Sequence, residues 1–130
     1  MSPAARRALT LLGLIGLCAA YLQGGLNKLF DYPGAVAEAV HFNLPLPAAT
    51  AAVTIAVELL ASAMVITGRR RRLGALALML FTLAATAVAN RYWELPPGME
   101  RFMAANSFYE HLGLAGAFLL VALWDRRAVA

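Results

Sequence analysis

Long apolar stretches separated by short polar segments make up most of the chain. Four of these stretches are about 17 to 20 residues long, and a helix that crosses a bilayer needs about 20 apolar residues. Because a helix satisfies its backbone hydrogen bonds internally, helices are the expected structure in lipid. The pattern predicts an all-α integral membrane four-helix bundle, a single domain over residues 1–130 with spans at residues 8–27, 48–67, 73–89 and 108–124.

The segments between the spans carry helix signals of their own. In DYPGAVAEAVHFNLPLP, Pro33 suits a first helical turn, Val36 and Val40 share one helical face, and two prolines follow. We expect a short interfacial helix there, on the outer surface of the membrane. In RYWELPPGMERFMAANS we expect a turn at Pro-Pro-Gly and a second short helix at residues 99–103, before the fourth span.

Composition agrees with a membrane protein. Hydrophobic residues make up 62% of the chain and charged residues only 14%, whereas soluble domains are nearer half apolar and a quarter charged. The net charge of +4 does not indicate a nucleic-acid partner, because the basic residues lie at the ends of apolar runs. The single cysteine, Cys18, excludes an internal disulfide, a Cys-x-x-Cys redox pair and a cysteine zinc cluster.

The basic residues predict the orientation in the membrane. Eight of the eleven lie at the N-terminus (Arg6, Arg7), in the RRRR run at residues 69–72, and at the C-terminus (Arg126, Arg127). The positive-inside rule then places both termini in the cytoplasm and the other two loops outside. The first span resembles a secretory signal, but it continues past any cleavage site, so we expect it to be retained.

Polar residues recur at helical spacing within and beside the spans. Thr54, Glu58 and Ser62 are four residues apart, as are Thr82, Thr86 and Asn90, so each set shares one helical face. The first span carries Gln23 and Asn27, and the fourth opens with Asn106 and Glu110 and with Ser107 and His111 at the same spacing. These four stripes, facing one another, would form an outward-opening polar pocket with Glu58 at its floor. The candidate ligand-binding residues are Gln23, Asn27, Lys28, Glu58, Asn90, Arg91, Glu110 and His111.

Glu58 is the candidate that most needs an explanation. An acid at the bilayer centre costs about 2.5 kcal/mol or more, so it should face the bundle interior and find partners. Lys28, Arg91 and His111 are the candidate cations, and Lys28 is favoured because its long side chain can reach inward. Two interpretations stay open: a buried polar lock between helices, and an acid that anchors a ligand or relays a proton.

The histidines and the cysteine have simpler interpretations. His41 and His111 lie in no metal-ligand motif, so no metal site is expected. His111 is either an interfacial hydrogen-bonding residue or a group that exchanges protons with a redox ligand. Cys18 is expected to be a small packing residue. The small residues Gly16, Ala20 and Gly24 suit close helix contact, within the bundle or in a homo-oligomer.

Several motifs taken together carry a family resemblance. The segment GGLNKLFDYPG, the glutamate of VELLASAMVITG and the segment GRRRRLGALALMLFTLAATAVANRYW resemble the DoxX family of small four-helix bacterial membrane proteins. The closing segment FYEHLGLAGAFLLVAL fits the last helix of that family. The family's Gly-x-x-Lys signature falls on Gly25 and Lys28, and its second-helix acid falls on Glu58. The chain departs from related members, which often have His at Asn90 and Lys-Asn at the start of the fourth helix.

The resemblance implies an inner-membrane protein linked to membrane redox chemistry. Some members resemble subunits of thiosulfate:quinone oxidoreductases, and others associate with oxidative-stress or sulfur-handling proteins. Three functions fit. The first is an accessory or quinone-interacting subunit of an oxidoreductase, without its own metal or flavin, that works with a redox or sulfur-metabolism partner. The second is a non-redox binding or transport protein for a small amphipathic molecule. The third is a structural assembly factor.

Overall fold

The computed structural model describes residues 1–124, and the part of the chain that it describes is helical with no strand. Four helical segments are long and apolar enough to cross a membrane, as the hydrophobic pattern predicted. The second of them is one continuous rod in three sections. In chain order the elements are α1 (Pro3–Phe30), α2 (Tyr32–His41), α3 (Pro47–Ala56), the π-helical turn η1 (Val57–Ala61), α4 (Ser62–Thr67), α5 (Arg71–Ala89), the 3-10 turn η2 (Tyr92–Glu94) and α6 (Met99–Trp124).

The first and last helices extend beyond the apolar runs. The helix α1 begins at Pro3, where the Ser2 side chain accepts a hydrogen bond from the Ala5 backbone N–H, and it continues to Phe30. The helix α6 begins at Met99 rather than at residue 108, after Gly98 with its φ of 150°. The expected separate helix at residues 99–103 is therefore the first turn of α6. Hydropathy marks the part of a helix suited to lipid, whereas the ends depend on caps and turns.

The helix expected in the first loop is present as α2. Pro33 lies in its first turn, and the Asp31 side chain caps it by accepting a hydrogen bond from the Gly34 N–H at 3.1 Å. The alanine face of α2 is the one that packs against the bundle. Ala35 and Ala39 are buried, whereas Val40 is 57% exposed. Small residues allow α2 to lie close to its neighbours, and Val40 is free to meet lipid.

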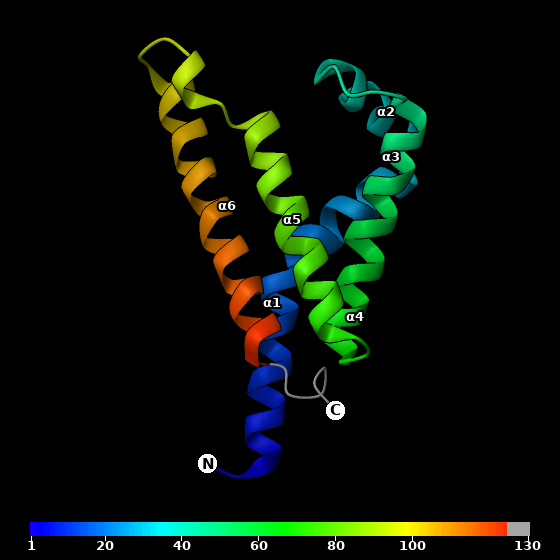
Figure 1. Ribbon diagram of the computed structural model, residues 1–130, viewed down its shortest axis with the longest axis vertical. Helices are drawn as coiled ribbons and strands as arrows, with labels where there is room; N and C mark the ends of the chain where they lie inside the picture. The colour runs from blue at the N-terminus through cyan, green and yellow to red at the C-terminus, as the bar shows by residue number, and fades with distance from the viewer. Residues whose placement is uncertain (125–130) are drawn as a thin grey trace.

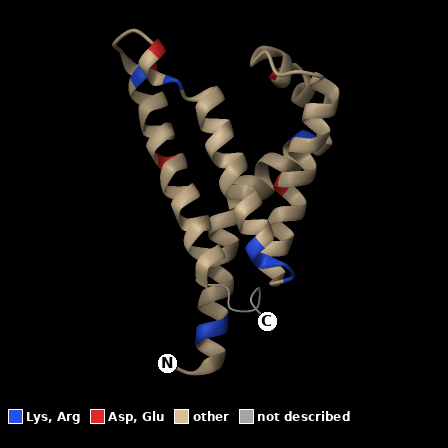
Figure 2. Ribbon diagram, in the orientation of Figure 1, with Lys and Arg blue, Asp and Glu red and all other residues tan. Residues whose placement is uncertain are grey.

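The helices form a V (Figure 1). The helices α5 and α6 lie side by side as one arm, α2 and the start of α3 form the other, and α1 and α4 pack at the base. The arms separate toward the end that carries α2 and η2, which we call the open end. The opposite end carries Arg6, Arg7 and the arginines of residues 69–72, and we call it the arginine end (Figure 2). Arg126 and Arg127 lie outside the described residues, so the cytoplasmic placement of both termini stays a prediction.

The buried core occupies the base of the V. Its largest fully buried side chain is Phe118, whose ring meets that of Tyr21 edge-on with centroids 5.4 Å apart. The Tyr21 hydroxyl donates to Thr82 Oγ1, and the Thr82 hydroxyl donates to the Leu78 carbonyl at 2.6 Å. The buried hydroxyl groups of Tyr21 and Thr82 therefore have partners, as burial requires. With the base fixed in this way, the arms can hold a cavity between them.

Candidate functional site

Glu58 lies in the single turn of π-helix, η1. The turn continues α3 without a break and leads directly into α4, so the acid is part of a rigid rod. A π turn inserts an extra residue into a helix and changes the direction in which side chains leave it, and such turns are frequent at functional sites. Only 4% of the Glu58 surface is exposed. The carboxylate is thus held in the interior by an irregular but well-defined turn.

Lys28 reaches this acid from the end of α1. Its Nζ donates to Glu58 Oε1 at 2.9 Å, which forms a mostly buried ion pair between α1 and η1. The long aliphatic stem lets the lysine carry its charge inward from the helix end. Of the three candidate cations, Lys28 is the one that the structure pairs with Glu58.

Two consecutive glycines allow α1 to approach this turn. A Cβ on Gly24 would lie 2.8 Å from Glu58 Oε2, and a Cβ on Gly25 would lie 2.7 Å from Leu59 Cδ2. A side chain at either position would displace the Glu58 carboxylate or the Leu59 side chain. The GG pair therefore leaves room for the close packing of α1 on η1 in which Lys28 bonds Glu58.

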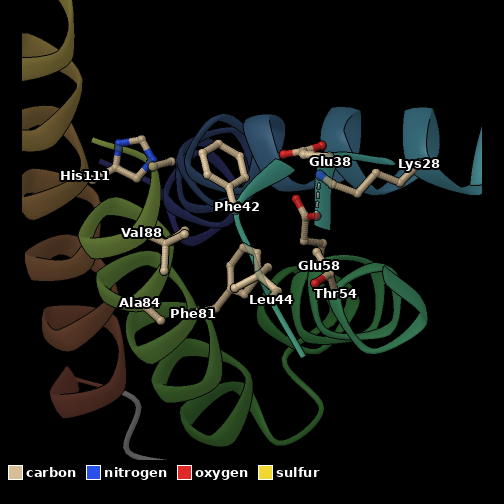
Figure 3. Close-up of a pocket in the computed structure, with 12 residues that line it drawn as sticks. Lys28, Glu38, Phe42, Leu44, Thr54, Glu58, Phe81, Ala84, Val88 and His111 are labelled. Atoms are coloured by element: carbon tan, nitrogen blue, oxygen red, sulfur yellow. Dashed lines mark hydrogen bonds and ion pairs between the residues drawn. The ribbon is translucent and has the colours of Figure 1, made fainter. Parts of the chain in front are cut away.

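A cavity of about 350 Å³ lies between the arms of the V and reaches this ion pair. Phe42 and Leu44 from the α2–α3 connection face Phe81 and Val88 of α5 across it (Figure 3). Lys28, Glu38, Thr54 and Glu58 supply polar groups on one side, and His111 of α6 lies on the other (Figure 3). We call this the apolar-walled pocket. Its walls suit a ring or hydrocarbon, and its polar groups suit oxygen atoms.

His111 has a defined tautomer in this position. Its Nδ1 lies 2.7 Å from the Ser107 carbonyl oxygen, which only accepts hydrogen bonds. The proton of the neutral ring is therefore on Nδ1, and Nε2 is left as an acceptor. His111 can accordingly accept a hydrogen bond, or a proton, from a group in the pocket.

A second hollow, of about 300 Å³, lies beside the ion pair at the end of α1. We call it the polar groove. Its lining residues are Gln23, Gly24, Asn27, Lys28, Asp31, Gly34, Ala35 and Glu38. Lys28 and Glu38 line both hollows, so they mark the place where the groove and the pocket meet.

The eight sequence candidates divide into three groups. Lys28, Glu58 and His111 line the apolar-walled pocket. Gln23 and Asn27 line the polar groove. The other three line neither hollow: Asn90 donates to Thr86 Oγ1 at 3.0 Å, Arg91 lies 3.4 Å from Glu94 Oε1, and Glu110 is exposed.

Sequence reasoning missed Glu38 and the aromatic walls. Glu38 lies on α2, and residues 31, 34, 35 and 38 all line the polar groove. That spacing is the signature of one helical face, so the pattern was available in the sequence of the outer loop. Phe42 gave no such signal, because aromatic residues near a membrane interface usually serve as anchors. Phe81 gave none because an aromatic residue in the middle of α5 fits an ordinary apolar position of a membrane span. Within residues 1–124 no three His, Cys, Asp or Glu side chains are grouped to hold a metal ion.

Comparison with known proteins agrees with the family motifs. The model of the DoxX family matches residues 9–91, which include both glycines, Lys28 and Glu58. The chain belongs to the DoxX family. It is 25% identical over 127 residues to inner membrane protein YphA of Escherichia coli (strain K12), an alignment that covers 98% of this chain and 90% of that protein. No solved structure matches the chain. Family, relative and four apolar helices together support a multi-pass protein of the inner membrane.

Proposed function

We propose that the protein is a quinone-binding accessory subunit of a redox system in the inner membrane. The observation that carries the proposal is the apolar-walled pocket with the Lys28–Glu58 pair on one side and His111 on the other. Ligand sites are typically apolar cavities with a few placed polar groups, and this one has that character. A quinone is a flat ring with two oxygens and an apolar tail, so it meets both kinds of lining.

The residues present fit both states of such a ligand. The Lys28 ammonium uses one donor on Glu58 and has others free for a quinone carbonyl. Nε2 of His111 accepts, which suits the hydroxyl of a quinol. Phe42 and Phe81 supply aromatic surface for the ring between them. The quinone supplies the redox chemistry when bound, and this chain orients it and shields it from water.

The electrons come from a partner protein. We propose no flavin or metal in this chain. The accessory role follows: the subunit presents a bound quinone to a redox or sulfur-metabolism partner. A non-redox binding function would use the same pocket, so the experiment has to separate binding from redox coupling.

The first test is binding to purified protein in mild detergent. Lipids and quinones retained by the protein are identified by mass spectrometry, and affinity for a short-chain ubiquinone and a short-chain menaquinone is measured by tryptophan quenching. Loss of a hydrogen bond to a charged group costs about 1.5 to 3 kcal/mol, so Lys28→Met should weaken binding about 10- to 100-fold. His111→Ala tests the other side of the pocket without touching the ion pair.

Matched controls come from candidates outside the pocket. Arg91→Met removes an exposed cation and Glu110→Gln an exposed acid at the same end of the molecule, and neither should change affinity. If both quinones bind no better than a detergent-like alkyl chain, the quinone proposal is wrong. Retention of a different amphipathic molecule would identify the non-redox binding function. If the purified protein retains no small molecule and has normal stability, the structural assembly role is the function that remains.

A further inference from the structure

The two oxygens of the Glu58 carboxylate face different surroundings. Oε1 accepts the hydrogen bond from Lys28. Oε2 lies toward Gly24, so closely that a Cβ there would be 2.8 Å away, and Gly24 lines the polar groove. Within residues 1–124 no donor bonds Oε2, although Glu58 is only 4% exposed. A mostly buried carboxylate therefore has an oxygen without a protein donor, next to a glycine that lines the groove.

The groove has the properties of a hydrated space. A buried polar atom without a partner costs about 1 to 3 kcal/mol, so a donor is needed at Oε2. Water requires polar partners and a share of volume of about 30 Å³ per molecule. The groove offers about 300 Å³ and the exposed side chains of Gln23 and Asn27. Water in such a groove would supply the donor that Oε2 lacks within the protein.

On the side of Glu58 that faces the arginine end, buried side chains block the approach of water. Ser62, one turn nearer the arginine end, is fully buried, and so are Cys18 and Val65. Water can therefore approach Glu58 from the open end and not from the arginine end.

We infer that the polar groove is an aqueous path by which Glu58 exchanges protons with the side of the membrane at the open end, with Gly24 as the part of its wall that leaves the carboxylate uncovered. The charged or titratable groups around Glu58 are Lys28 from α1, Glu38 from α2 and, across the pocket, His111 from α6. Asp31 lines the groove itself, and the α5 residues that line the pocket carry no charge. The path does not depend on which ligand the pocket takes. This inference is therefore independent of the quinone proposal, and either can fail without the other.

Cysteine accessibility tests the path. The single native cysteine is replaced (Cys18→Ala), and cysteines are introduced one at a time as Asn27→Cys, Glu58→Cys and Ser62→Cys. A membrane-impermeant cationic methanethiosulfonate is added to sealed vesicles of either orientation, and the modified fraction is read from the intact mass. Asn27→Cys and Glu58→Cys should react from the open end, and Ser62→Cys should react from neither side.

A substitution at Gly24 provides a second test of the path. Gly24→Ala, added to Glu58→Cys, narrows the wall and should slow the reaction severalfold. Gly16→Ala is the matched control, because a Cβ on Gly16 of the same helix meets nothing within 4 Å. The inference is overturned if Glu58→Cys stays unreactive while Asn27→Cys reacts, or if it reacts equally from the arginine end. If Glu58→Cys does not fold, the unaltered chain decides: a quaternary ammonium carbodiimide applied from the open end should modify Glu58, and absence of the adduct refutes the path.

Discussion

Replacing Lys28 by Met leaves the Glu58 carboxylate buried without its cation. At the 2.9 Å separation of Nζ and Oε1 and an effective dielectric constant of about 20, Coulomb's law gives an attraction of about 6 kcal/mol. Much of that attraction offsets the cost of desolvating both charges, so the pair adds far less to net stability. The loss of one partner is nevertheless expensive, at about 3 to 5 kcal/mol, because the other charge is stranded.

The two halves of the pair should not cost the same. The Lys28 side chain is 22% exposed and lines the polar groove, whereas that of Glu58 is 5% exposed. After Glu58→Gln the lysine can turn toward water, so the loss should be about 1 to 3 kcal/mol. After Lys28→Met the glutamate cannot leave the rod, so the loss should reach about 3 to 5 kcal/mol. The double variant strands no charge and should be more stable than Lys28→Met alone.

The assay is a double-mutant cycle by thermal unfolding in one detergent at one scan rate. We expect a coupling free energy of about 1 to 3 kcal/mol between the two positions. The exposed Arg91–Glu94 pair, with its atoms 3.4 Å apart, is the control cycle, and its coupling should lie within about 0.5 kcal/mol of zero. Additive single changes at Lys28 and Glu58, or a smaller loss for Lys28→Met than for Glu58→Gln, would refute the reasoning.

Two further predictions concern topology and packing. Cysteines at Glu38 and Arg70 should be labelled from opposite sides of the membrane, Glu38 from outside, and outside labelling at Arg70 would contradict the positive-inside orientation. Gly74→Ala should lower the free energy of unfolding by about 1 to 3 kcal/mol, because its Cβ would lie 2.8 Å from the Ala61 backbone oxygen. Gly116→Ala on α6 meets nothing within 4 Å and should leave the unfolding temperature unchanged or raise it, because alanine is the better helix former, so an equal loss in the two variants would show the packing argument to be wrong.

The fold class could be predicted from the sequence because membrane helices have a strong signal. Runs of about 20 apolar residues are rare in other structures, and the family motifs lie in fixed order along them. The helix ends were less predictable. The fourth span was expected at residue 108, whereas α6 begins at Met99, because a helix with polar residues can continue beyond the apolar run.

The site could be predicted only in part. The i, i+4 spacing of Thr54, Glu58 and Ser62 indicated a shared interior face, and in the structure Glu58 and Ser62 are buried. The same spacing fits an ordinary α-helix, so it carried no sign of the π turn. It also could not separate Asn90 and Glu110, which line neither hollow, from His111, which lines the pocket. Which polar stripes meet depends on how the arms of the V spread, and that is a tertiary property.

The surroundings of Glu58 argue against a purely structural role for the ion pair. A buried pair often stabilises a fold no better than apolar residues of the same size, so a lock between helices does not need charge. Here the acid lies in a π turn, and Gly24 beside it costs a helix about 1 kcal/mol relative to alanine. A lock would also be firmest with both carboxylate oxygens bonded and no space around them. Instead one oxygen has no protein donor, and the pair borders an apolar-walled pocket and, through Lys28, the polar groove. Features that cost stability are expected to coincide at functional sites. At Glu58 they coincide around one carboxylate that lines a ligand-sized pocket and lies beside a polar groove, which is the arrangement that proton exchange with a bound ligand requires.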